Sequence, residues 1–95
     1  MPTLLPGDRL LIDPGAYRDR APAVGEVVVL QDPEARVPWL VKRVAAVDQA
    51  AGTVEVLGDA RAVARDSRQF GPVPLRAIVG KVYRVYYPLD RRRDL

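Results

Sequence analysis

Apolar residues occur along this chain in short runs, and Pro, Gly and Asp residues bound most of the runs. Runs of four to eleven residues rich in Val, Ile, Leu and Tyr are typical of β-strands, and the residues between them are typical of turns. The strands that this pattern predicts occupy residues 8–13, 25–30, 39–47, 53–57 and 77–87. The sequence therefore predicts a mainly β protein that forms a single compact antiparallel domain.

The run at 39–47 is expected to be the central strand and to form a hairpin with 53–57 across the turn "DQAAG". Because side chains alternate along a strand, Lys42 shares a face with apolar neighbours. The alternation places Leu40, Lys42, Val44 and Ala46 on one face, and Trp39, Val41, Arg43, Ala45 and Val47 on the other. Two interpretations of Lys42 stay open at this point: its stem covers the core while its amine reaches water, or the amine is buried for a chemical purpose.

Residues 58–76 show no sustained period, and they are expected to form an ordered loop with a helical turn or two. The domain is expected to span residues 1–88. Residues 89–95, which end in "RRRDL", are expected to be a basic, solvated C-terminal tail.

Composition narrows the possible chemistry. The 95 residues include no Cys and no His, which excludes disulfides, thiol nucleophiles, the usual zinc sites and Ser-His catalysis, and no cofactor or metal is expected. No apolar run is long enough to span a membrane, so the chain as given is expected to be soluble. Its localisation is open: cytoplasmic, or membrane-associated if an anchor precedes it.

Thirteen arginines accompany only two lysines, Lys42 and Lys81. A lysine, unlike an arginine, can lose its proton in an apolar site and act as a base.

Three stretches together resemble the signal peptidase I family. They are "MPTLLPGDRLLID" at 1–13, "LVKRVAAV" at 40–47 and "GDARAVARDSRQFGPVPLRAIVGKVY" at 58–83, and they follow the family's order over nearly the whole chain. In length and layout the chain is similar to short forms without a membrane anchor, such as the maturation proteases of nickel superoxide dismutase. The resemblance implies the β fold of that family, with Lys42 on the central strand and the first strand entering beside it.

The resemblance also implies a serine endopeptidase that cleaves extended peptides after small residues through a Ser-Lys dyad. Lys42 matches the general base. The residues that match the supporting motif are Pro2, Thr3, Gly58, Asp59, Asp66, Ser67 and Arg68. Asp66 and Arg68 are expected to form an ion pair with a structural role.

Two departures from the family pattern bear on activity. The nucleophilic Ser of the pattern falls two residues before Met1, and Ala64 stands where the family has a Ser that orients the lysine. Ala60 replaces the Asn of the third motif. Neither Thr3 nor Ser67 matches the nucleophile. The chain as given is therefore expected to be inactive, whether the serine is truncated or lost.

Two alternatives remain beside the peptidase. One is a non-catalytic relative that binds an extended peptide by adding a strand to a sheet edge. The other is a small basic β-barrel that binds nucleic acid through arginines and the tyrosines Tyr83, Tyr86 and Tyr87. The second alternative leaves the three ordered motifs unexplained, so no nucleic-acid partner is expected.

Overall fold

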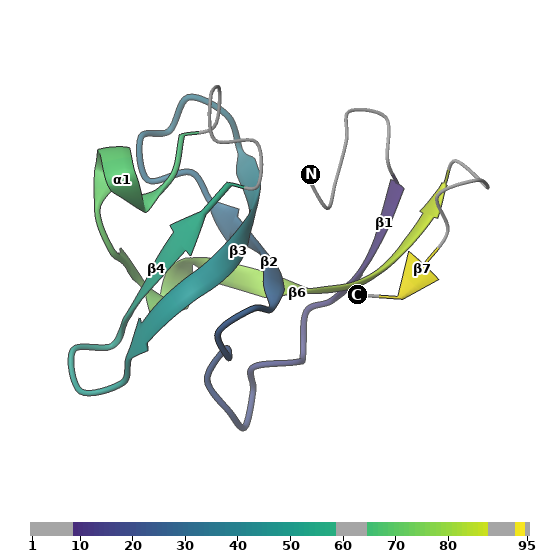
Figure 1. Ribbon diagram of the computed structural model, residues 1–95, viewed down its shortest axis with the longest axis horizontal. Helices are drawn as coiled ribbons and strands as arrows, with labels where there is room; N and C mark the ends of the chain where they lie inside the picture. Colours follow the sequence, from purple (N-terminus) through teal and green to yellow (C-terminus); the bar gives the residue numbers. More distant parts are fainter. Residues whose placement is uncertain (1–8, 59–64, 88–92, 95) are drawn as a thin grey trace.

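The protein folds into one antiparallel β-sheet of seven strands (Figure 1). The computed structural model describes residues 9–58, 65–87 and 93–94. The strands are β1 (Arg9–Asp13), β2 (Val27–Gln31), β3 (Trp39–Asp48), β4 (Thr53–Leu57), β5 (Val73–Pro74), β6 (Ile78–Tyr87) and β7 (Arg93–Asp94). Their order is β1-β6-β2-β3-β4-β5, and β7 pairs with β6. The mainly β prediction is confirmed, and the five predicted strands correspond to β1, β2, β3, β4 and β6 within two residues at each end.

The long strand β6 organises the sheet, and Figure 1 shows it running across the molecule. Its first half pairs with β2, and its second half pairs with β1. The first strand was expected to lie beside the lysine strand. This expectation is wrong, because β6 and β2 separate β1 from β3 in the order of the sheet. A glycine favours this pairing of β1 with β6. A Cβ on Gly80 would lie 2.7 Å from the carbonyl oxygen of Asp13, so only glycine admits this approach.

The predicted hairpin of β3 and β4 is confirmed. In its turn, the backbone N–H of Ala51 donates to Asp48 Oδ1 at 3.0 Å, and Gly52 has a φ of 71°. A left-handed residue at this point favours glycine, since other side chains clash there.

The strict alternation expected along β3 is wrong beyond Val44. A bulge between Val44 and Ala46 leaves Ala45 without a partner in β4 and shifts the register. After the bulge Val47, and not Ala46, pairs with a core residue, Val54, and packs against the core. A bulge adds one residue to one strand, so it exchanges the two faces of every residue that follows.

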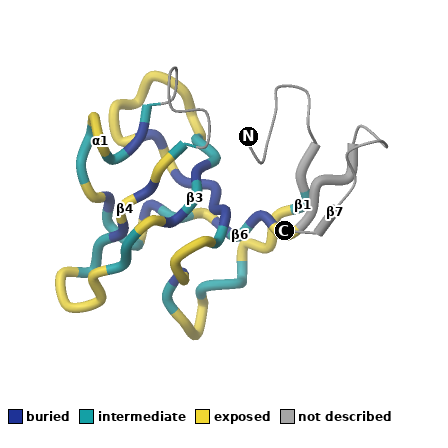
Figure 2. Tube along the Cα trace, in the orientation of Figure 1, coloured by how far each residue is buried: buried dark blue, intermediate teal, exposed yellow. Residues whose placement is uncertain are grey.

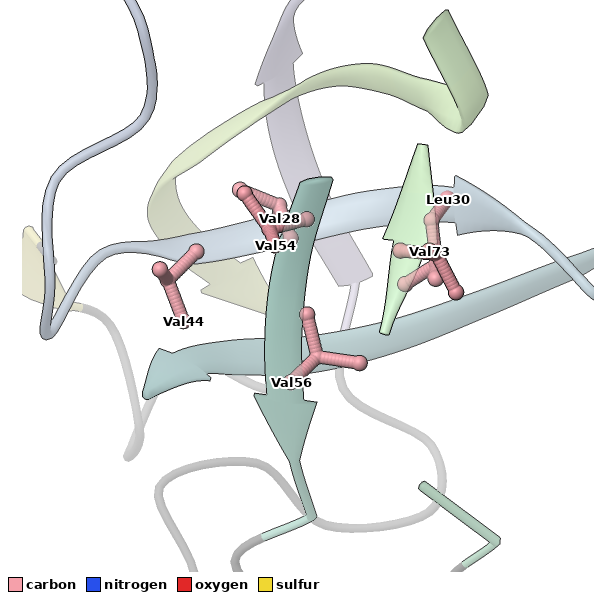
Figure 3. Close-up of a cluster of buried hydrophobic side chains, with 6 residues drawn as sticks. All are labelled: Val28, Leu30, Val44, Val54, Val56 and Val73. Atoms are coloured by element: carbon pink, nitrogen blue, oxygen red, sulfur yellow. The ribbon is translucent and has the colours of Figure 1, made fainter. Parts of the chain in front are cut away.

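Two apolar clusters form the interior. The larger consists of Val28, Leu30, Val44, Val54, Val56 and Val73 (Figure 3). The smaller consists of Val27, Val29 and Val82, with Val41 packed against it. Consecutive residues of β2 thus enter different clusters, so both faces of this strand are covered. Figure 2 shows the buried chain concentrated in the part built from β2, β3, β4 and the first half of β6.

The segment between β4 and β6 contains the short helical structure that the sequence predicted. The helix α1 (Ser67–Phe70) is followed by β5, which pairs with β4, and by the 3-10 turn η1 (Leu75–Ala77). Residues 59–64 of the predicted loop lie outside the described residues. In the expected C-terminal tail, Arg93–Asp94 forms β7. Across the described residues, no helix has the length and apolarity that a membrane crossing requires.

Candidate functional site

Lys42 lies in the middle of β3 and points into the protein. Its register partner on β2 is Val28, which belongs to the larger apolar cluster, as does Val44 on the same face of β3. Lys42 is only 9% exposed, so most of its side chain is removed from water. This burial lowers the pKa of Lys42 below its ordinary value, because an apolar surrounding disfavours the charged form. The stem of Lys42 therefore covers the core, which both interpretations of this residue share.

Asp66 lies beside the lysine strand at the start of α1. Its fully buried carboxylate accepts hydrogen bonds from the backbone N–H of Gly58 at 2.8 Å and of Arg68 at 2.9 Å. The guanidinium of Arg68 adds two more, at 3.0 Å from Nε and 2.6 Å from Nη2. Arg68, followed by the backbone donors, holds the pKa of Asp66 well below its usual range. The predicted Asp66–Arg68 ion pair is therefore confirmed.

The helix cap fixes this carboxylate in place. Asp66 caps α1, and its own backbone N–H donates to the side chain of Gln69 at 2.9 Å, which completes a capping box. Gly58 directly follows β4, whose last residue, Leu57, pairs with Arg43. The bond from the Gly58 N–H therefore places Asp66 next to the segment of β3 that carries Lys42.

Ser67 has a structural contact. Its Oγ accepts a hydrogen bond from the backbone N–H of Val56 at 2.8 Å, which ties α1 to β4. This bond satisfies a donor inside the core and holds the hydroxyl away from β3. The other residues of the predicted motif, Pro2, Thr3 and Asp59, and the replaced positions Ala60 and Ala64, lie outside the described residues.

An ion-pair cluster near Lys42 was missed by the sequence analysis. Arg65 forms a bidentate pair with Asp32, at 3.1 Å to Oδ1 and 2.8 Å to Oδ2, and it also bonds Glu34 at 2.7 Å. Asp32 follows β2, and in the sequence "QDPE" it indicates only a turn. Its partner is 33 residues away, and no local pattern connects the two.

Four charged side chains therefore act on the lysine amine. The carboxylates of Asp66 and Asp32 raise its pKa, and the guanidinium groups of Arg65 and Arg68 lower it. Burial is the largest of these influences, and the pKa of Lys42 is lowered. A lysine in such surroundings has a larger neutral fraction at moderate pH than an exposed lysine, and a neutral amine can accept a proton from a hydroxyl.

Part of the outer edge of β3, next to Lys42, has no strand partner within the part of the chain that the structure describes. β4 pairs with β3 only from Arg43 onward, and no strand among the described residues pairs with that edge of residues 39–42. Trp39 begins this segment and is 54% exposed. Unpaired backbone groups along an edge are the usual means by which a sheet takes up an extended peptide.

Comparison with known proteins agrees with this geometry. The family model described as "Signal peptidase, peptidase S26" matches residues 1–49 and 47–87. A curated relative, the mitochondrial ATP-independent inner membrane protease subunit 1b of Arabidopsis thaliana, is 34% identical over 111 residues. The alignment covers 95% of this chain and 66% of the relative, so the chain spans slightly less than two thirds of that protein. No solved structure matches the chain.

The family match extends across the lysine strand, the Asp66–Arg68 pair and the β6 strand, which are the parts of the molecule that build the site. By this match and by its similarity to the plant protease subunit, the chain belongs to the signal peptidase family, peptidase S26.

Proposed function

We propose that this protein is the catalytic domain of a Ser-Lys endopeptidase of the signal peptidase type, which cleaves extended peptides after small residues. The observation that carries the proposal is the burial of Lys42, a single lysine among core valines with a pKa lowered by that burial. Burying a lysine side chain lowers the stability of the protein. A catalytic role for the neutral amine explains why a lysine occupies this position.

In the proposed reaction, Lys42 in its neutral form accepts the proton of a serine hydroxyl, and the serine oxygen attacks the peptide carbonyl. The lysine then returns this proton to the leaving amine as the peptide bond breaks, and an acyl-enzyme remains. Lys42 next accepts a proton from water, which attacks the ester, and the serine regains its hydrogen. The serine is the one that the family pattern places two residues before Met1.

The open edge of residues 39–42 supports an extended peptide as the substrate. A peptide lying along this edge would bond backbone groups of β3 that pair with no described strand, and it would pass beside Lys42. The same edge also supports the second candidate, a non-catalytic relative that binds such peptides without cleaving them.

A cleavage assay distinguishes these candidates. It compares the chain 1–95, the chain extended at its N-terminus by Ser-Met, and the extended chain with Lys42→Met, on peptides with a small or a bulky residue before the cleaved bond. We expect no cleavage by 1–95 and slow cleavage by the extended chain after small residues only. The rate should be low, because Ala64 leaves one lysine-orienting hydroxyl absent.

Lys42→Met preserves the length of the side chain and removes the base, so we expect the rate of the extended chain to fall by about 10²–10⁴-fold. The rate of the unmodified extended chain should rise with pH through the lowered pKa of Lys42 and then level off. If 1–95 cleaves and Lys42→Met has no effect, the dyad is wrong. Binding of small-residue peptides without any cleavage by the extended chain would instead support the non-catalytic candidate.

A further inference from the structure

Backbone N–H groups of the loop between β2 and β3 donate hydrogen bonds to one buried carboxylate, that of Asp32. Asp32 accepts hydrogen bonds from the backbone N–H groups of Glu34 at 2.9 Å, Arg36 at 3.0 Å and Val37 at 3.1 Å. Its side chain has no exposed surface. Within the same loop Ala35 adopts a left-handed φ of 56°, which an alanine takes only when its surroundings impose it. Asp32 therefore fixes the conformation of the chain that enters the lysine strand.

Arg65 joins this loop to the lysine site. Its guanidinium binds both oxygens of Asp32 and one of Glu34, and the residue that follows it is Asp66. Bidentate Arg–carboxylate pairs fix both distance and orientation, so one side chain holds the β2–β3 loop and the start of α1 in a fixed relation. Lys42 lies on the strand between them.

Asp32 also lies on the side of the sheet to which the lysine points. It follows Val28 and Leu30 at intervals of two along the chain, both of these residues belong to the larger apolar cluster, and Val28 is the register partner of Lys42. Asp32 and Arg65 both act electrostatically on the Lys42 amine, in opposite directions, so without Arg65 the charge of the buried Asp32 carboxylate would act on the amine without the guanidinium that offsets it. Three backbone N–H groups would keep that carboxylate ionised.

The other charges around the amine come from the neighbouring elements. α1 and its cap contribute Arg68 and Asp66, which neutralise each other. β6 contributes Lys81, which pairs with Val28 from the side opposite to Lys42. Asp59 and Arg61 belong to a segment outside the described residues.

We propose that Arg65 is a positioning residue for Lys42: by holding the carboxylate of Asp32 in a bidentate pair, it keeps this carboxylate from pairing with the lysine amine and leaves the amine available as a base. This inference rests on the proposed function of Lys42. It gives the Asp32–Arg65 pair a role in setting the protonation of the lysine, in addition to its role in fixing the loop.

The proposal predicts opposite effects for the two partners. Arg65→Met removes a positive charge and leaves the Asp32 carboxylate unneutralised, so the pKa of Lys42 should rise. Asp32→Asn removes the negative charge, retains an oxygen for the loop N–H groups, and leaves Arg65 bound to Glu34, so the pKa of Lys42 should fall. A role limited to holding the loop would not move the lysine titration in opposite directions.

The measurement is an NMR titration of the chain 1–95 with 13C at the lysine ε-carbons. Only Lys42 and Lys81 carry the label, so each spectrum contains two side-chain signals. The matched control is Arg20→Gln, which breaks the Arg20–Glu26 ion pair in the connection between β1 and β2, where Glu26 keeps its hydrogen bonds from Tyr17 and Ala23. We expect this control to leave both lysine midpoints unchanged.

An upward shift in Arg65→Met together with a downward shift in Asp32→Asn supports the proposal. Unchanged midpoints, or shifts of the same sign in both variants, overturn it. If Arg65→Met does not fold, Asp32→Asn decides alone, and a midpoint that stays or rises overturns the proposal. The titration does not depend on cleavage, so failure of the peptidase assay and failure of this inference are separate results.

Discussion

At the scale of single residues, the site depends on side chains whose polar atoms are fully engaged. Asp66 accepts four hydrogen bonds and Asp32 five, and among the described residues no buried side-chain nitrogen or oxygen lacks a partner. Buried carboxylates that are satisfied in this way hold one geometry, because any movement breaks several bonds at once. The charged groups near Lys42 are therefore held in fixed positions.

Ser67→Ala tests a single hydroxyl. The backbone N–H of Val56 would lose its acceptor in the core, and we expect a loss of about 1–3 kcal/mol in the free energy of unfolding. Urea denaturation measures this loss. In the Ser-Met-extended chain, cleavage by the folded fraction should continue, because Ser67 has a structural contact. Complete loss of cleavage in a variant that remains folded would identify Ser67 as part of the chemistry.

At the scale of elements, β6 joins the two ends of the molecule, and Gly80 lies where β1 crosses it. A Cβ at this position would lie 2.7 Å from Asp13 O and 2.9 Å from Ile12 Cγ2. It would also lie 2.9 Å from Pro14 Cα, and both Asp13 O and Pro14 Cα are backbone atoms, which cannot move as a side chain does. The pairing of β1 with β6 therefore depends on the absence of a side chain.

Gly80→Ala should displace the end of β1 and lower the free energy of unfolding by about 1–3 kcal/mol. Amide hydrogen exchange should show the loss concentrated in β1 and the second half of β6. Val79→Ala is the matched control, since Val79 is adjacent in β6 and exposed, and it should have little effect. Equal exchange in Gly80→Ala and in the unmodified protein would mean that β1 accommodates the methyl group.

At the scale of the whole molecule, ion pairs join segments that the sheet ladder leaves apart. Glu26 accepts bonds from Tyr17, Arg20 and Ala23, which fixes the connection between β1 and β2. Arg20, with these other donors, lowers the pKa of Glu26 to about 2, and the arginine partners likewise lower the pKa of Asp32 and of Asp66.

These lowered pKa values predict acid sensitivity. Each carboxylate has a lower pKa folded than unfolded, so the stability that it contributes is present above the unfolded pKa of about 4 and is lost as pH falls through the folded value. We expect urea midpoints to be level between about pH 5 and 7 and to decrease steadily toward about pH 2. In Asp32→Asn the decrease should be shallower. A midpoint that does not change with acid would contradict the contribution of these pairs.

Much of the fold could be predicted from the sequence because its determinants are local. Runs of β-branched residues between turn residues identify β2, β3, β4 and β6 wherever they lie in the chain. The hairpin of β3 and β4 follows from the short turn between them. Asp66 and Arg68 are two residues apart, so their pairing also required only local geometry. Lys42 was singled out because it interrupts an apolar strand, and its assignment as the base came from the resemblance to the signal peptidase I family.

Tertiary structure decided what depends on distant partners. The bulge at Ala45 exchanged the faces of Ala46 and Val47, because packing against β4 selects which side chain enters the core. β1 paired with β6 and not beside β3, since the close approach at Gly80 is a contact between segments far apart in the chain. The Asp32–Arg65 pair joins residues 33 positions apart, and each looks like an ordinary surface charge in its own segment. The sequence thus determined the strands and the candidate base, and only the folded chain determined which charges surround that base, because burial and charge pairing depend on segments that meet in space.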